Sequence, residues 1–311
     1  MNEEIRNAAI PRRALWIVNP KSRQGSTDLA EARALLERGG IRLREAVPDD
    51  ATDVARSIEA HAGEVDCVIV GGGDGTLNCA APAIVDRKLP LGILPLGTAN
   101  DLARTLGLPT GLREAAGVIV NGHARKIDIG RANDVYFFNA ADIGLGARVT
   151  ARLDRGTKRR WGMLAYPRAL LGAWRGNRAF SAQIRCDDRE ETVRAIQLKI
   201  ANGKYYGGGA SVLEDAAIDD ERLDLLAIRP QGMLDLLRLA PAVRVGAARA
   251  SPRVDVRSAR KIDISTRRRM EISTDGEITT ATPARFRVVP RAVTVYVPAP
   301  ARVAIRGDEA C

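Results

Sequence analysis

The sequence predicts an α/β domain with a doubly wound parallel sheet, over residues 1–125, followed by an antiparallel β-sandwich domain over residues 126–311. In the first part, short apolar runs alternate with helical patterns at a spacing of about 20 residues, which is typical of parallel βαβ units. In the second part, longer alternating runs follow one another mostly without helices, which indicates antiparallel sheets. The last strand is a candidate for packing back on the first domain.

The expected elements follow from apolar periodicity and from turn residues. In the first domain, strands are expected at 14–18, 41–47, 65–70 and 91–94, and helices at 28–38, 50–61 and 77–85. In the second domain, strands are expected at 127–131, 135–142, 180–186, 192–201, 223–228, 261–266, 270–273, 284–289 and 292–297.

Composition limits the classes of function. The net charge of +10 favours an anionic partner, such as a nucleotide, a nucleic acid or an acidic membrane surface. With only two histidines, a histidine-rich metal site or a Ser-His-Asp hydrolase is disfavoured, so acid–base chemistry falls to carboxylates. No apolar run reaches the roughly 18–20 residues of a membrane span. Neither a secretory signal nor metal-ligand spacing of the four cysteines is visible, so we expect a cytoplasmic protein.

A glycine-rich loop follows the most apolar predicted strand. Gly71, Gly72 and Gly73 come directly after Val70 and precede Asp74, Gly75 and Thr76. A strand that runs through glycines into a helix start brings backbone N–H groups close to a phosphate. A carboxylate among such amides calls for a cation, and Mg²⁺ is the natural one. A βα turn without any ligand is the alternative.

Two other strand ends of the first domain carry similar residues. Asn19, Pro20, Lys21, Ser22 and Arg23 follow the first strand, and the run from Pro95 to Asp101, with Thr98 and Asn100, follows the fourth. In a right-handed parallel sheet these ends meet at one edge, where ligands bind. Turn chemistry alone explains each loop singly, but it explains all three together poorly.

The stretch from Arg148 to Arg178 contains nine basic residues, one acidic residue and several aromatic and apolar side chains. This pattern suits contact with an anionic membrane surface. A basic helix that packs its apolar side on the sheet is equally compatible, and contact with nucleic acid is less favoured.

Four further places in the second half could carry chemistry. Asp128 lies between two β-branched residues, and a glycine cluster occupies residues 202–209. Five acidic residues crowd into residues 215–224, which indicates either a hard-cation site or a solvated loop. Asp275 and Glu277 flank Gly276 in a hairpin signal, and paired carboxylates could also supply a base.

Four of these motifs together resemble the diacylglycerol kinase catalytic family, specifically the bacterial YegS/BmrU-like soluble lipid kinases. They are Gly72 to Thr76 with Asn78, Leu96 to Asp101, Tyr205 to Gly209, and Asp275 to Glu277. The resemblance runs from about residue 14 to 298 and implies a first domain like that of NAD kinases and phosphofructokinases.

The resemblance also implies roles for individual residues. ATP would be held by Asn19, Pro20, Lys21, Ser22, Arg23, Gly72, Gly73, Asp74, Gly75, Thr76, Asn78, Thr98 and Asn100. Asp74, Asp101 and Asp128 would form an acidic network with Mg²⁺ and the nucleotide. Asp220 and the carbonyl groups of Ala217 and Arg222 would bind a second, structural Mg²⁺. Glu277 would accept the proton of the lipid hydroxyl, with Asp275 beside it, in a cleft between the domains.

The chain departs from the family pattern at four positions. Arg23 and Glu221 stand where the family usually has glycine, Glu214 replaces a common proline, and Glu45 aligns with an expected hydroxyl residue. The prediction is therefore an ATP- and Mg²⁺-dependent lipid kinase at the inner face of the membrane, with no nucleic-acid partner and with a homodimer left open. A soluble NAD-kinase-type enzyme and a non-catalytic lipid- or nucleotide-binding regulator are the alternatives.

Overall fold

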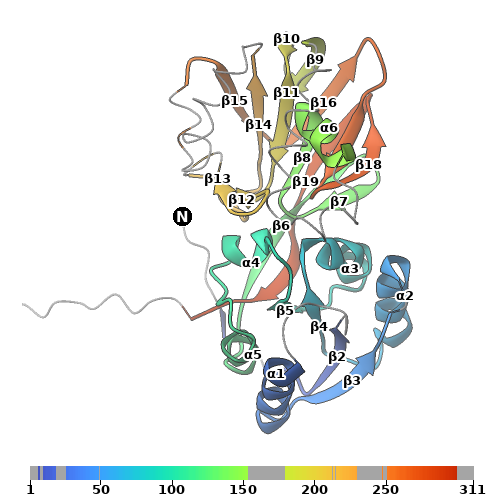
Figure 1. Ribbon diagram of the computed structural model, residues 1–311, viewed down its shortest axis with the longest axis vertical. Helices are drawn as coiled ribbons and strands as arrows, with labels where there is room; N and C mark the ends of the chain where they lie inside the picture. The colour runs from blue at the N-terminus through green and yellow to red at the C-terminus, as the bar shows by residue number, and fades with distance from the viewer. Residues whose placement is uncertain are drawn as a thin grey trace, which may run out of the picture.

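The computed structural model describes residues 6–7, 10–18, 26–48, 50–152, 179–211, 213, 215–229, 247 and 251–299. These residues form two lobes, an α/β lobe and a β lobe (Figure 1). In the described part of the chain, no helix is both long and apolar enough to cross a membrane.

The α/β lobe is built on four parallel strands in the order β5-β4-β2-β3. They are β2 (Arg13–Val18), β3 (Arg42–Ala46), β4 (Cys67–Gly72) and β5 (Leu91–Pro95). Every residue of β4 is buried, as its continuous apolar run predicts for a strand covered on both faces.

Helices cover both faces of this parallel sheet (Figure 1). α1 (Ser26–Arg38) packs with α5 (Leu112–Val120), and α2 (Ala51–His61) packs with α3 (Asp74–Arg87). The doubly wound architecture is thus confirmed. α3 begins three residues before the helix expected at 77–85, so Asp74 lies in its first turn. α5 and the short α4 (Asp101–Thr105) were not predicted.

The parallel strands continue, through β19 (Ala284–Tyr296), into antiparallel strands of the same eleven-stranded sheet. In the β lobe, a six-stranded antiparallel sheet packs against these antiparallel strands. The six strands are β15 (Val254–Ala259), β14 (Leu223–Ile228), β11 (Gln197–Ala201), β8 (Ala140–Gly144), β17 (Glu271–Thr274) and β18 (Glu277–Ala281). The facing strands are β10 (Arg189–Ala195), β9 (Phe180–Cys186), β16 (Lys261–Thr266) and β19. The core between them includes Phe137 and Phe286, whose rings meet edge to face with centroids 6.4 Å apart. The antiparallel second domain is confirmed.

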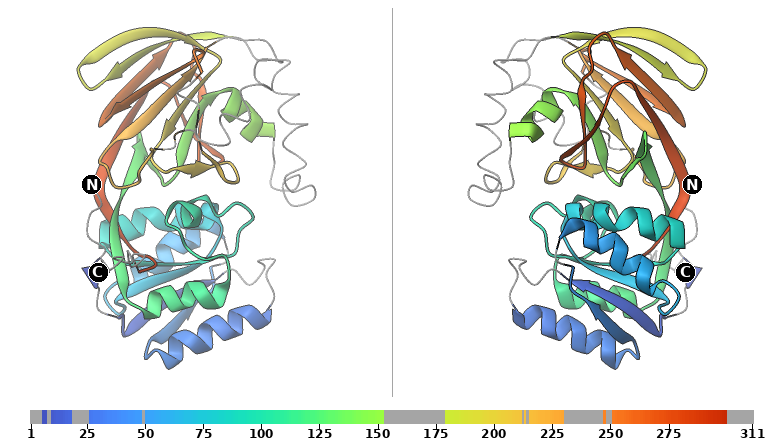
Figure 2. Two further views of the ribbon diagram at one scale, coloured as in Figure 1. Left: turned by 90° about the vertical axis from the view of Figure 1, so that its left-hand side faces the viewer. Right: turned by 90° about the vertical axis from the view of Figure 1, so that its right-hand side faces the viewer.

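Two long strands join the lobes. β6 (His123–Ala132) pairs with β19 along most of its length, and Figure 2 shows both running from the β lobe into the α/β lobe. Near its C-terminal end, β19 pairs in parallel with β5 through Val295 and Leu91. The last described strand therefore ends in the α/β lobe. The two strands expected at 284–289 and 292–297 are one strand with a bulge between Val289 and Val293.

Two predicted strands are each divided. The run 135–142 breaks into β7 (Val135–Phe137), which pairs with β6, and β8, which lies in the other sheet. Likewise, the run 192–201 breaks at Ile196 into β10 and β11, which also belong to different sheets. Alternation of apolar residues continues through such corners, so periodicity alone does not reveal them. The strands β15 and β18 were not predicted.

Candidate active site

Asp74 connects the two loops that follow β4 and β5. Its carboxylate oxygens accept hydrogen bonds from the backbone N–H groups of Asp101 and Leu102, each at 3.1 Å. These amides begin α4, so the acid of the glycine loop is anchored to the neighbouring loop. The predicted meeting of these two strand ends is what the structure shows.

The glycines of the two loops serve different purposes. A Cβ placed on Gly97 would lie 2.5 Å from the Cα of Gly73 and 2.7 Å from Asn100 Oδ1, and ordinary contacts begin near 3.4 Å. Gly73 and Gly97 are therefore required by the close approach of two backbones. A Cβ on Gly75 would meet nothing within 4 Å. Gly75 is exposed and leaves open space at the start of α3.

Asn100 closes the second loop on itself. It adopts a left-handed conformation with φ of 51°, and its side chain accepts a bond from the Gly97 N–H and donates one to the Gly97 carbonyl, both at 2.9 Å. Thr98 is left exposed at the tip, and Thr76 is half-buried. Asn78, one turn after Asp74, has a buried Oδ1 without a hydrogen-bond partner among the described residues.

Asp101 holds the glycine turn of the β lobe. Its carboxylate accepts the N–H groups of Gly208 at 3.0 Å and Gly209 at 2.7 Å. Burial above all, together with the nearby charge of Asp74, raises the pKa of Asp101, although the two amide bonds work in the opposite direction. The carboxylate is thus shared between the two lobes at their junction.

Asp275 stabilises the corner between β7 and β8. It accepts N–H groups from Phe138 at 2.7 Å, Asn139 at 3.0 Å and Ala140 at 2.9 Å. Burial, to which the charge of Asp74 adds, raises its pKa to about 7. Glu277 lies two residues further on, exposed, at the start of β18. Asp275 is therefore engaged by three backbone amides, whereas Glu277 is the exposed carboxylate of the pair.

Asn139 is a site residue that sequence reasoning missed. Its Nδ2 lies 3.4 Å from Asp74 Oδ1, its backbone N–H binds Asp275, and its carbonyl accepts the N–H of Asn202 at 2.8 Å. Its Oδ1 is buried and, within the described structure, has no partner. A single continuous strand was predicted across this corner, which hid the asparagine. Its signal would have been a polar residue inside an otherwise apolar run.

Comparison with known proteins identifies the family. The profile of the diacylglycerol kinase catalytic domain matches residues 13–132, and that of the YegS C-terminal NAD kinase beta sandwich-like domain matches residues 139–297. The chain belongs to the diacylglycerol kinase family. It is therefore a lipid kinase by class, as its motifs predicted.

Individual relatives of this kinase are similar over nearly their whole length. A protein of Mycobacterium tuberculosis named diacylglycerol kinase is 31% identical over 294 residues, which cover 91% of this chain and 94% of the relative. An Enterobacter protein named "Probable lipid kinase YegS-like" is 32% identical, with 92% and 96% covered. A crystal structure of a diacylglycerol kinase from Bacillus anthracis superposes with a TM-score of 0.77 at 25% identity, covering 93% of this chain and 97% of that one.

Asp128 of this kinase lies apart from the Asp74–Asp101 pair. Its carboxylate accepts the backbone N–H groups of Glu221 at 2.6 Å and Arg291 at 2.7 Å, so it fastens the acidic loop to the bulge of β19. Burial raises the pKa of Asp128, although the two hydrogen bonds act to lower it. The structure thus brings Asp74 and Asp101 together directly, whereas the hydrogen bonds of Asp128 go to a different pair of segments.

The acidic loop, residues 215–224, has a left-handed backbone conformation at Glu221, which glycine would favour. Glu221 has a φ of 58°, and its carboxylate pairs with Arg260 and Arg291. Asp220 Oδ1 accepts the N–H of Arg222 at 2.9 Å, and Ala217 is half-buried nearby in the loop. Across the described ranges, no group of three or more His, Cys, Asp or Glu side chains is placed to hold a metal ion.

Two predicted regions lie outside the described residues. They are the loop Asn19, Pro20, Lys21, Ser22 and Arg23, and residues 153–178 of the basic segment. The first residues of that segment belong to α6 (Leu145–Arg152), which packs on β8 and β17.

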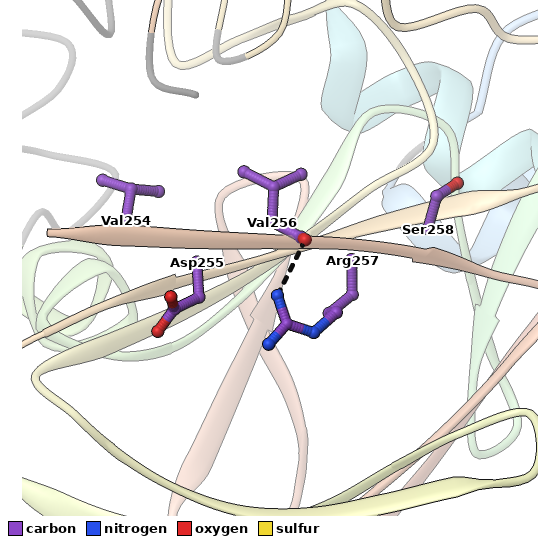
Figure 3. Close-up of a pocket in the computed structure, with 5 residues that line it drawn as sticks. All are labelled: Val254, Asp255, Val256, Arg257 and Ser258. Carbon is purple, nitrogen blue, oxygen red and sulfur yellow. Dashed lines mark hydrogen bonds between the residues drawn. The ribbon is translucent and has the colours of Figure 1, made fainter. Parts of the chain in front are cut away.

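A hollow of about 500 Å³ runs along β15 (Figure 3). Val254 and Val256 point to one side of the strand, and Asp255 and Arg257 point to the other. β15 and β18 form opposite edges of the six-stranded sheet, so this hollow is remote from the β17–β18 hairpin that carries Asp275 and Glu277.

Proposed function

We propose that this kinase uses ATP and Mg²⁺ to phosphorylate a hydroxyl group of a lipid such as diacylglycerol or phosphatidylglycerol. The observation that carries the proposal is the junction of the lobes, where Asp74 binds the start of α4, lies 3.4 Å from Asn139, and adjoins the corner held by Asp275. The loops after β4 and β5 in one lobe thereby meet, through Asn139, the corner that Asp275 holds in the other, and the proposal assigns the nucleotide to these loops.

The residues at this junction fit a hard cation and a polyphosphate. Asp74 and Asp101 supply carboxylate oxygens, and the buried oxygens Asn78 Oδ1 and Asn139 Oδ1 have no partner in the described structure. Carboxylate and amide oxygens are the ligands that suit Mg²⁺, which when bound neutralises phosphate charge. The open start of α3 at Gly75, with the half-buried Thr76, offers amides for phosphate.

Glu277 would act as the proton acceptor. As the lipid oxygen bonds to the γ-phosphorus, the bond to the bridging oxygen of ATP breaks and the hydroxyl proton passes to Glu277. Asp275 would act through position, because its three amide bonds fix the corner that carries Asn139. Positioning and charge neutralisation would then supply most of the catalysis.

Two additional contacts belong to the proposal. Asp220, with the carbonyl groups of Ala217 and Arg222, would hold a structural Mg²⁺ in the loop that Asp128 fastens. The segment from Arg148 to Arg178, with its nine basic residues, would dock the enzyme on the anionic inner face of the membrane.

Transfer of labelled γ-phosphate from ATP to a mixed lipid extract tests the proposal. Labelled lipid is expected with wild-type protein and Mg²⁺, and only traces of it with Glu277→Gln. Glu271→Gln is the matched control, because Glu271 is an exposed glutamate of the same hairpin. Absence of labelled lipid in spite of ATP binding would overturn the lipid acceptor and make NAD the next acceptor to test.

A further inference from the structure

A buried lysine of the β lobe lies outside the site described so far. The neighbours of Lys199 in β11, Leu198 and Ile200, belong to the core between the two sheets, so Lys199 points to the opposite face. Its Nζ lies 2.7 Å from Asp142 Oδ1 on β8, and Gln197 Nε2 donates to the same oxygen at 2.8 Å. The lysine is only 4% exposed.

The ammonium group also contacts an aromatic ring. Lys199 Nζ lies 3.7 Å from the centroid of the Tyr206 ring, well inside the range of a cation–π interaction. Tyr206 belongs to β12 (Tyr205–Tyr206), which pairs with β13 (Ala210–Ser211) to form a small hairpin. Burial, and then the charges of Asp142 and Asp101, raise the pKa of Tyr206, so this side chain feels the charge of both carboxylates.

The turn of this hairpin is the one that binds Asp101. Gly207, Gly208 and Gly209 have φ values of 59°, 95° and 92°, which fix a turn that other residues adopt with strain. The N–H groups of Gly208 and Gly209 bind the Asp101 carboxylate, and Tyr205 N–H donates to Thr105 Oγ1 on α4. A continuous set of contacts therefore runs from Lys199 to Asp101.

We propose that Lys199 is a positioning residue of the kinase: it holds Tyr206, and Tyr206 places the Gly208 and Gly209 amides that orient the Asp101 carboxylate. A buried ion pair contributes little net stability compared with well-packed apolar residues, so we assign the role of this pair to the arrangement that it imposes on Tyr206. The inference rests on the proposed function in one respect, namely that Asp101 serves the nucleotide and Mg²⁺ site.

Lys199→Met tests the inference, because it keeps the unbranched chain, one atom shorter, and removes its charge. The amides of Gly208 and Gly209 are expected to exchange with deuterium on the order of tenfold faster, and KM for MgATP to rise on the order of tenfold. The amides of residues 138–140, which Asp275 holds, are expected to keep their protection. A merely structural role would lower the fraction of folded enzyme, which reduces the maximal rate but leaves KM unchanged.

Four further variants separate the contacts. Tyr206→Leu removes the aromatic face and should repeat both effects, whereas Tyr206→Phe keeps the face and should not. Lys199→Met/Asp142→Asn leaves no unpaired charge, so stability should recover while KM stays raised. The matched control is Lys204→Met. Lys204 directly precedes β12, and its Nζ lies 6.0 Å from the centroid of the neighbouring Tyr205 ring.

Unchanged exchange at Gly208 and Gly209, together with an unchanged KM in Lys199→Met and Tyr206→Leu, would overturn the inference. If Lys199→Met does not fold, Tyr206→Leu carries the test. If the wild-type enzyme transfers no phosphate to lipid, the proposed function fails, and the exchange measurement still decides whether Lys199 positions the turn.

Discussion

The contact between Gly73 and Gly97 provides a test of what the glycines of the loops after β4 and β5 do. In Gly97→Ala the new Cβ would start 2.5 Å from the Gly73 Cα and must move to at least about 3.4 Å. The Cβ is fixed rigidly to the backbone of one loop and the Cα belongs to the backbone of the other, so one loop must shift by about 1 Å relative to the other. Overpacking of this kind costs about 1–3 kcal/mol of unfolding free energy.

The same shift displaces Asp74 from the amides of Asp101 and Leu102. A misplacement of about 1 Å in a catalytic group can reduce the rate by about 10²-fold. We therefore expect Gly97→Ala to lower both the urea midpoint of unfolding and kcat/KM for lipid phosphorylation. Gly75→Ala, in the same motif, has open space for its Cβ, so its stability should equal or exceed that of the wild type.

The two variants separate folding from ligand binding. If phosphate approaches the start of α3, as proposed, Gly75→Ala should raise KM for ATP at least about tenfold with no loss of stability. Full stability of Gly97→Ala would refute the backbone-contact argument. Wild-type ATP kinetics in Gly75→Ala would show that phosphate binds elsewhere.

Three further predictions concern the carboxylates, the amide between them and the basic segment. The pKa of Asp275 is raised to about 7 from 3.8, so the folded state holds this proton more tightly than the unfolded state does; the resulting stabilisation is full below pH 3.8 and is lost as pH rises through about 7. The urea midpoint of Asp275→Asn should therefore change less with pH than that of the wild type over this range, and an equal change with pH would contradict the raised pKa. Asn139→Leu removes the amide between Asp74 and the Asp275 corner and should lower kcat about 10²-fold with little effect on lipid KM, measured by steady-state kinetics against an Asn133→Ala control on the β6–β7 turn. Charge reversal of Arg159 and Arg160 should weaken binding to anionic liposomes at low salt, and sedimentation with unchanged binding would rule out this docking segment.

The sequence contained enough local information to locate the loops after β4 and β5. Gly71 to Thr76 and Pro95 to Asp101 each come at the end of an apolar run that is typical of a buried strand in a parallel sheet, and parallel strands bring their carboxyl ends to one edge. The contact of Asp74 with the start of α4 follows that rule. The motif Asp275 to Glu277 was likewise visible, because an Asp-Gly hairpin leaves few other conformations.

The division of labour among these residues depended on tertiary contacts. Nothing local distinguishes Gly73, which touches another backbone, from Gly75, which faces open space. Asp275 and Glu277 are similar acids two residues apart. Only Asp275 accepts three backbone hydrogen bonds from residues 138–140, which lie 135–137 residues away along the sequence.

What the sequence by itself determined was the class of fold, the order of the elements and the loops that carry the site, because apolar periodicity and turn chemistry act over a few residues. Tertiary structure alone decided where strands change sheets, that β19 is one strand linking both lobes, and that Asn139 and Lys199 lie beside the carboxylates. Those outcomes depend on pairing between segments far apart in the chain, and no local pattern records which partner a buried polar group meets.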